Sequence, residues 1–591
     1  MKVMILKEKY LGAEILAKCL RDEGVKYVFG LVGHGNLPFI DAIDKEGIQF
    51  ISCHHETIAA MAADGYFRAS HRPGVLCTTC TPGALNAQLG IATAAADHSA
   101  IVHITGDIPL QFAGKGTYEE LDINGPDWQF HSLFLMFKHA WKVSNIKLLP
   151  EILANAFNVA LSGCPGPVLI DIPFDLATKE VETGLIEMKK RRPGKPSGDP
   201  NLVERAADLL LTAKSPVIFV GGGISLSEAA DEVLQLAELL GAPIVTSIMG
   251  SCAIPGKHPL MMGLVGTYGI EGANKFARQA DVILAVGARF EEEETAIWTD
   301  HVFRIPPTKL IQIDIDPKII GKNYPIEIGI VGDAKNTLIN LIRIIKGRIH
   351  GSQALNKDRI EEVHKEKEKH FKKIEHLIIS TDRPVSARRL LKELEDRFPE
   401  NGILVVDPSW PRIGLIQQFF LPGPTRCYIV GGVLPIGWST AASIGIQLAR
   451  PDSKVIAISG DGGFLLNNQA VLTAVEYDLP ILWIIINNGA YYALEVLQKA
   501  YFGKSIGSRF IRQKTGQPLD INYAELAKVF KADGERIQDP EEIGPAIERG
   551  IRAVKPYIID CVVNPETSRL VRVGPVTWEF FWEEMREVRK R

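Results

Sequence analysis

Two polar clusters in the last third of the chain have the residue types and spacing of a metal and phosphate site. Asp461, within a Gly-Asp-Gly turn, follows the apolar run Val455–Ser459, and Asn488 closes an Asn-Asn pair after the run Ile481–Ile486. Such runs are typical of buried parallel strands. A right-handed crossover between the two strands would bring their carboxyl ends to one edge of the sheet, where ligands bind. Carboxylate, amide and backbone oxygens suit Mg²⁺ shared with a phosphate.

The chain between the two motifs predicts a helix that would be capped by Asn467 and would end near Tyr477. A Gly-Asp-Gly turn alone is ordinary turn chemistry. Two polar clusters on consecutive strands favour a binding site over that alternative.

The pattern of apolar runs along the whole chain predicts an α/β fold with three consecutive doubly wound parallel-sheet domains, which would position these side chains. Residues 1–190 alternate short apolar runs such as YVFG with helical patterns such as Gly12–Glu23, which predicts a parallel sheet flanked by helices. The Pro- and Gly-rich linker RPGKPSGDP (192–200) marks the boundary at which a second unit, residues 191–350, begins. A densely charged linker helix, 351–383, leads to the third unit, 384–591, which carries the metal motif. Its terminal stretch from Trp578 predicts an amphipathic helix, either a lid or a packed segment.

The second unit contains a glycine-rich turn. The predicted strand Val217–Val220 is followed by Gly221, Gly222 and Gly223, a turn that lets a phosphate approach backbone amides. A plain tight turn explains the same glycines equally well. Further along, the capping-box spacing of two residues predicts a helix as far as Leu240; the two residues are Ser225 and Glu228.

Composition excludes several classes of protein. With 46 % apolar residues, 23 % charged residues and a net charge of −4, the 591-residue chain is ordinary for a globular protein, and we expect no nucleic acid or membrane partner. Eight irregularly spaced cysteines suit a reducing compartment. The apolar run near the N-terminus is too short for a signal peptide, and no run reaches the length of a membrane span. We therefore expect a cytoplasmic protein.

The Gly-Asp-Gly and Asn-Asn motifs, separated by 463–486, resemble the signature of thiamine-diphosphate enzymes. The resemblance implies that Mg²⁺ bridges the cofactor's diphosphate and is held by Asp461, Asn488 and the carbonyl of Ala490. It also implies cofactor contacts from the neighbouring loop residues, namely Gly460, Gly462, Gly463 and Tyr491.

Almost the whole chain resembles acetohydroxyacid synthase and its relatives. HHETIAAMAADGYFRAS looks like the family's activating segment and makes Glu56 the carboxyl group that hydrogen-bonds to the cofactor's aminopyrimidine ring. GGVLPIGWSTAASIG places Ile436 beneath the bent cofactor and the Leu434 carbonyl at its 4′-amino group. In this family the site lies between two subunits, so we expect a homodimer or homotetramer, with a small regulatory subunit as a possible partner.

The expected reaction is the decarboxylation of a 2-oxo acid and carboligation, giving 2-acetolactate from pyruvate. Some positions depart from that family: Glu119 replaces a glutamine, Phe174 a lysine and Leu497 a tryptophan. NNGAYYALE instead resembles benzoylformate decarboxylase, although Thr79 replaces one of that enzyme's histidines. GHGN resembles the inositol-pathway trihydroxycyclohexanedione hydrolases and places His34 near the substrate, where it could relay a proton. A non-ligating decarboxylase and a C–C lyase or hydrolase on another carbonyl substrate therefore remain alternatives.

The middle unit resembles the FAD-binding domain of acetohydroxyacid synthase. The resemblance implies nucleotide contacts from residues in GGG, GARF, DIDP and GDA, namely Gly221, Gly222, Gly223, Gly287, Arg289, Asp314 and Asp333. Cys164 and Glu293 replace two FAD-contacting arginines, and a carboxylate near a diphosphate is unfavourable. Three alternatives stay open for this unit: FAD, another nucleotide, or no ligand.

Overall fold

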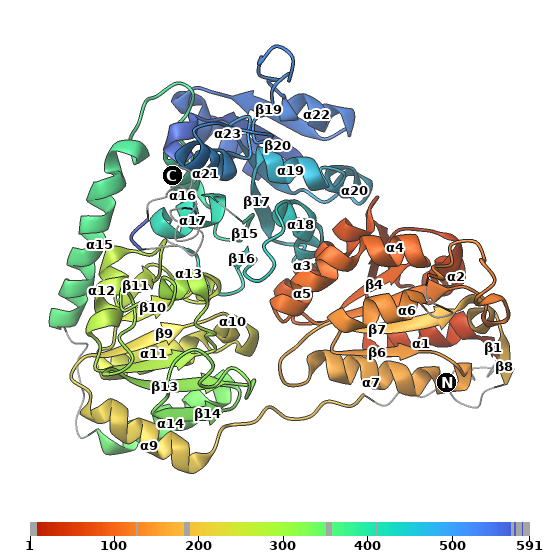
Figure 1. Cartoon of the computed structure of the whole chain (residues 1–591), viewed down its shortest axis with the longest axis horizontal. Helices are drawn as coiled ribbons and strands as arrows, with labels where there is room; N and C mark the ends of the chain where they lie inside the picture. The colour runs from red at the N-terminus through yellow and green to blue at the C-terminus, as the bar shows by residue number, and fades with distance from the viewer. Residues whose placement is uncertain are drawn as a thin grey trace, which may run out of the picture.

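The computed structural model describes residues 9–123, 125, 128–182, 190–349, 357–408, 410–419, 421–568, 572–574 and 582. Within these residues the chain forms three six-stranded sheets and one two-stranded sheet. Figure 1 shows the first domain in red and orange, the central domain in yellow and green, and the third in teal and blue, arranged around a common centre. All strand pairs of the three large sheets are parallel.

The first sheet has the order β3-β2-β4-β5-β7-β6. Its strands are β2 (Tyr27–Gly30), β3 (Gln49–Ser52), β4 (Gly74–Thr78), β5 (Ile101–Asp107), β6 (His139–Lys142) and β7 (Val168–Pro173). The helices of this domain are α1 (Gly12–Glu23), α2 (Leu37–Lys45), α3 (Glu56–Ser70), α4 (Thr81–Asn86), α5 (Gln88–Ala96), α6 (Trp128–Leu133), α7 (Leu149–Leu161) and α8 (Phe174–Ala177). An antiparallel pair, β1 (Lys9–Leu11) and β8 (Glu180–Glu182), lies beside them.

The central sheet has the order β11-β10-β9-β12-β13-β14. Its strands are β9 (Pro216–Val220), β10 (Ile244–Thr246), β11 (Met261–Leu264), β12 (Val282–Val286), β13 (Lys309–Asp314) and β14 (Ile328–Val331). Its helices are α9 (Pro200–Thr212), α10 (Gly223–Ser227), α11 (Ala230–Leu240), α12 (Glu271–Gln279), α13 (Glu292–Thr295) and α14 (Ala334–Arg348). Counted along the chain, this is the order 3-2-1-4-5-6 of dinucleotide-binding folds, whose strand order reverses between β9 and β12.

The third sheet follows the charged helix α15 (Lys357–Ile378), which lies along the outside of the molecule (Figure 1). Its order is β16-β15-β17-β18-β20-β19, which, counted along the chain, is the order of the first sheet. The strands are β15 (Gly402–Val406), β16 (Cys427–Ile429), β17 (Lys454–Gly460), β18 (Leu482–Asn487), β19 (Asp533–Ile537) and β20 (Tyr557–Val562). The helices are α16 (Ala387–Arg397), α17 (Trp410–Gln418), α18 (Trp438–Ala449), α19 (Asp461–Asn467), α20 (Ala470–Glu476), α21 (Tyr492–Phe502), α22 (Tyr523–Val529) and α23 (Pro540–Arg552).

The predicted fold class is confirmed, and two helix-cap predictions are wrong. Ser225 lies inside α10, and Glu228 ends that helix in a left-handed conformation (φ 55°), so α11 starts afresh at Ala230. Asn467 is the last residue of α19 instead of a cap, because its side chain donates to the Gly437 carbonyl at 3.0 Å. The predicted terminal helix lies outside the described residues apart from Trp582.

Helices α3 and α18 join the first and third domains, lying side by side near the centre of Figure 1. Both are buried almost all round, as expected of helices covered on every side. Their backbones approach closely at two glycines: a Cβ on Gly65 would lie 2.3 Å from the Ala442 carbonyl oxygen, and one on Gly445 would lie 1.8 Å from that of Ala62. A side chain at either position would push the domains apart.

Gly445→Ala should therefore destabilise the protein by at least about 1–3 kcal/mol, since a methyl group cannot fit between the two backbones. The matched control is Gly347→Ala in α14, where an added Cβ meets nothing within 4 Å; it should be neutral or stabilising by up to about 1 kcal/mol. Thermal unfolding of the two variants measures the difference. Equal melting temperatures would contradict this account of the packing.

Candidate functional site

The third domain holds a buried carboxylate where two neighbouring strands end. Asp461 follows β17 and is 1 % exposed. Its Oδ1 accepts from the Gly462 amide at 2.8 Å, and its Oδ2 accepts from the amides of Asn488 and Gly489 at 3.1 and 2.6 Å. The carboxylate thus ties the end of β17 to the end of β18, as the crossover argument predicts.

The chemistry of this edge suits a divalent cation. Burial raises the pKa of Asp461 to about 6, against the opposing effect of the backbone amides. The side-chain oxygen of Asn488, Oδ1, is buried and has no hydrogen-bond partner among the described residues, which is costly unless something else binds it. A carboxylate beside an unpartnered amide oxygen is a donor set for a hard cation such as Mg²⁺. Ala490 lies two positions after Asn488, and its backbone pairs with Arg509.

Two glycines let other residues pack closely against the turn after β17. A Cβ on Gly462 would lie 2.5 Å from the Tyr491 ring, and one on Gly463 would lie 2.4 Å from Oδ2 of Asp407. Tyr491 packs edge-on against Phe510, with 5.2 Å between the ring centroids. A larger residue at either glycine would displace Tyr491 or Asp407.

The loop before α18 is held in a strained conformation. Leu434 has φ 58°, a left-handed conformation that is costly for a bulky residue and persists only where the surroundings enforce it. Here Asp407 accepts from the amides of Gly437 and Ser439 at 2.7 and 2.9 Å. Ile436, half-buried, lies between the strained residue and these anchors.

The first domain contributes a second buried carboxyl group. Glu56 is the first residue of α3 and is 5 % exposed. Its Oε2 accepts from Nδ2 of Asn86 at 3.0 Å. A Cβ on Gly83 would lie 3.1 Å from its other oxygen, Oε1, so a glycine there leaves one face of the carboxyl group clear.

An ion-pair network fixes the strained loop to the first domain. Asp97 accepts from Arg68 at 2.9 Å and from the amides of Gly431 and Gly432 at 2.9 and 2.6 Å. The Arg68 guanidinium also donates to the Ile429 carbonyl at 2.9 Å. The contacts with Ile429, Gly431 and Gly432 cross from the first domain to the third, and the Arg68–Asp97 ion pair holds their first-domain partners in place.

The predicted substrate-side residues of the first domain lie together at the same edge as Glu56. Nδ1 of His34, in the 3₁₀ turn η1 (His34–Asn36), lies 3.7 Å from Oε1 of Glu119. Thr79 donates to Oε2 of Glu119 at 3.3 Å.

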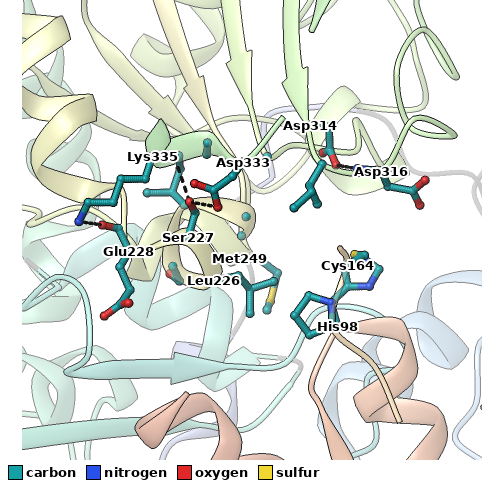
Figure 2. A pocket seen from close by; sticks show the side chains of 18 of the residues that line it. His98, Cys164, Leu226, Ser227, Glu228, Met249, Asp314, Asp316, Asp333 and Lys335 are labelled. Carbon is teal, nitrogen blue, oxygen red and sulfur yellow. Dashed lines mark hydrogen bonds between the residues drawn. The ribbon is translucent and has the colours of Figure 1, made fainter. Parts of the chain in front are cut away.

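A cavity of about 620 Å³ lies where the three domains meet (Figure 2). Of the residues predicted to hold a nucleotide, six line it: Gly222, Gly223, Gly287, Arg289, Asp314 and Asp333. Gly221 is not among the described lining residues; a Cβ there would lie 1.9 Å from the Gly287 carbonyl oxygen, so it permits two turns to pack together. The glycines lie at the ends of β9 and β12, where the strand order reverses.

The cavity is rich in buried acids. Burial raises the pKa of Glu294 to about 8 and that of Asp314 to about 6, and burial lowers the pKa of His98 to about 4. Figure 2 shows Ser227 bonded to Asp333, at 2.7 Å, on the opposite side of the cavity from His98.

Glu293, by contrast, pairs with Arg412 at 3.0 Å and is not among the described lining residues. The expected conflict between its carboxylate and a bound diphosphate therefore has no basis in this arrangement. Cys164 does line the cavity, and burial raises the pKa of its thiol to about 12.

Sequence reasoning missed Asp407 and Asp97. Asp407 directly follows the apolar strand β15, the same signal that identified Asp461. Asp97 had no such signal, because besides Arg68 its partners are backbone amides more than 330 positions away.

Comparison with known proteins agrees with this architecture. Residues 11–125 match the model of the thiamine pyrophosphate enzyme N-terminal TPP binding domain, 203–341 the central domain, and 413–561 the C-terminal TPP binding domain. The chain therefore belongs to the thiamine pyrophosphate enzyme family, as the motifs predicted.

Within that family the chain is of the acetolactate synthase large-subunit type. It is 36 % identical to the probable acetolactate synthase large subunit of Methanocaldococcus jannaschii, over 94 % of this chain and 92 % of the relative. It is 29 % identical to the acetolactate synthase large subunit of Haemophilus influenzae, over 95 % and 96 %, and to isozyme 2 of Escherichia coli, over 94 % and 95 %. In the part of the chain that the structure describes, no helix is long and apolar enough to cross a membrane.

Proposed function

We propose that this enzyme uses thiamine diphosphate and Mg²⁺ to decarboxylate a 2-oxo acid and to join the remaining fragment to a second 2-oxo acid, forming 2-acetolactate from pyruvate. The relatives named acetolactate synthase support this reaction. The observation that carries the proposal is the buried, unpartnered Oδ1 of Asn488 beside Asp461, in a family that binds thiamine pyrophosphate.

The third domain is assigned to the metal and the diphosphate. Asp461, Asn488 and the Ala490 carbonyl would hold Mg²⁺, since together they offer oxygen ligands at one edge of the sheet. The diphosphate would lie on the glycine-rich turn after β17, beside Gly460, Gly462, Gly463 and Tyr491. When bound, thiamine diphosphate supplies the electron sink for loss of CO₂.

Three residues are assigned to the organic part of the cofactor. Glu56 would share a proton with N1′ of the aminopyrimidine ring through the oxygen that faces Gly83. The carbonyl of Leu434 would accept from the 4′-amino group, and the strain at Leu434 supports this role because it orients that carbonyl. Ile436 would support the cofactor in its bent conformation.

We also propose that two copies assemble with the active sites between them. Large apolar side chains are exposed beside both groups of site residues: Leu85 in α4 and Leu89 in α5 lie close to Asn86 in the sequence, while Val433 adjoins Leu434, and Leu466 lies on α19. Exposed apolar side chains beside a site are expected where a second chain packs. A tetramer would extend the same contacts. Because the relatives are named large subunits, a small regulatory subunit is the further partner we propose.

For the central cavity we propose a nucleotide, with FAD as the candidate that the resemblance supplies. Glycines at the reversal point of a 3-2-1-4-5-6 sheet support this assignment. The purified protein should then show flavin absorbance in the visible range, and heat should release the flavin for identification by chromatography. A colourless protein that releases another nucleotide, or none, would contradict FAD.

With thiamine diphosphate, Mg²⁺ and pyruvate, the protein should release CO₂ and form 2-acetolactate. Glu56→Gln should lower turnover about 100-fold or more, because an amide cannot share a proton with the pyrimidine ring. The measurement is product analysis together with cofactor titration, and cofactor affinity should change far less than turnover. Free aldehyde as the main product would support a non-ligating decarboxylase instead, and unchanged turnover in Glu56→Gln would refute the assigned role.

Mg²⁺ affinity should fall about tenfold for each pH unit below the pKa of Asp461. That pKa is about 6, and the cation binds the carboxylate, so protons compete with it below pH 6 and not above. Titrations with Mg²⁺ and thiamine diphosphate at several pH values measure this slope. Asp461→Asn should bind weakly with no such slope, and an affinity independent of pH in the wild type would exclude Asp461 as a ligand.

A further inference from the structure

His34 and Glu119 form a close pair that none of the proposed cofactor contacts explains. The His34 side chain is 75 % exposed, whereas that of Glu119 is 15 % exposed, and Nδ1 and Oε1 are 3.7 Å apart. The imidazole also meets the Tyr118 ring edge-on, with 5.4 Å between centroids. The ring is therefore on the surface of the first domain, where a ligand can reach it.

The carboxylate of this pair is held from behind. Thr79 Oγ1 donates to Oε2 of Glu119 at 3.3 Å and accepts from the Gly35 amide at 3.0 Å. A single hydroxyl group therefore links the loop after β5, which carries Glu119, to the turn that carries His34. Glu119 itself has φ 64°, a conformation that is unfavourable for glutamate and typical of functional sites.

The pair lies beside the carboxyl group assigned to the cofactor. A Cβ on Gly83 would lie 3.1 Å from Oε1 of Glu56 and 3.0 Å from Cγ2 of Thr79. Thr79 and Glu56 therefore both lie next to Gly83. A substrate reacting next to the cofactor would lie within reach of this group of side chains.

We infer that His34 donates a proton to the carbonyl oxygen of the second substrate during carboligation and that Glu119 is the positioning residue that orients His34. The inference rests on the proposed function. As the carbonyl carbon of the second 2-oxo acid accepts the electron pair of the first substrate's reacting carbon, its C=O π pair takes the proton from the imidazolium ring, leaving a hydroxyl group and a neutral imidazole. His34, being exposed, regains a proton from water.

The charges of the pair distinguish this role from a structural one. Glu119 alone would repel an anionic 2-oxo acid, and His34 in its protonated form cancels that repulsion. Loss of His34 alone should therefore harm binding of the second substrate more than loss of both charges. If the pair only stabilised the loop, the double variant would bind the second substrate no better than the variant that lacks His34 alone.

The test uses the full-length protein with thiamine diphosphate, Mg²⁺ and pyruvate, in His34→Gln, Glu119→Gln and the double variant. Each single variant should form 2-acetolactate at least about tenfold more slowly while CO₂ release persists and the product shifts to free aldehyde. The double variant should form 2-acetolactate no more slowly than His34→Gln, because the effects of coupled residues are not additive. Its KM for pyruvate should be lower than that of His34→Gln. Glu119→Asp should recover part of the 2-acetolactate yield.

The matched control is Glu120→Gln. Glu120 is the neighbouring carboxylate, and it braces the same turn by accepting from the amides of Gly114 and Thr117. It should keep the wild-type ratio of 2-acetolactate to aldehyde, and cofactor affinity should be unchanged in every variant. The inference is overturned if the single variants keep the wild-type product ratio, if their effects simply add, or if Glu120→Gln reproduces them. A wild-type protein that releases no CO₂ from pyruvate overturns the proposed function and this inference together.

Discussion

The contact between α3 and α18 is the constraint on which the rest of the site depends. The helices approach so closely because Gly65 and Gly445 have no side chain between the backbones. The close approach buries Asp64, Asp97 and Arg68, and burial without partners would cost several kcal/mol for each charge. Their partners are each other, the Trp438 ring nitrogen (2.7 Å from Asp64) and the amides after β16. One packing choice thus sets both the domain arrangement and the position of the strained loop.

Much of this architecture could be predicted from local sequence. Buried parallel strands leave continuous apolar runs, and the run before Asp461 proved to be β17 and the one before Asn488 to be β18. The carboxyl ends of such strands meet at one edge, so the order of strands and motifs along the chain was enough to place the two motifs together. The predicted apolar run YVFG matches β2 (Tyr27–Gly30) residue for residue, and the predicted strand Val217–Val220 lies within β9 (Pro216–Val220).

Other features could not be predicted, because distant parts of the chain decide them. Ser225 and Glu228 have the spacing of a helix cap, yet α10 and its left-handed end occupy those positions. Asn467 has the residue type of a helix cap, but its side-chain amide donates to the carbonyl of Gly437, which lies 30 positions earlier in the chain. Asp97 has no local signal, since its role exists only once the first and third domains have met. That His34 and Glu119 lie near the substrate stays a prediction from resemblance, whereas the hydroxyl group of Thr79 that links their loops had no signal in the sequence.

The first and third sheets repeat the same strand order, whereas the central sheet has another. The chain therefore carries two sheet edges of equivalent topology with different side chains at them: Glu56 and His34 lie at the first, and Asp461 and Asn488 at the third. Under the proposed function each edge supplies only part of the site, however well its own domain folds. A substitution that one edge tolerates is therefore constrained by the residues present at the other.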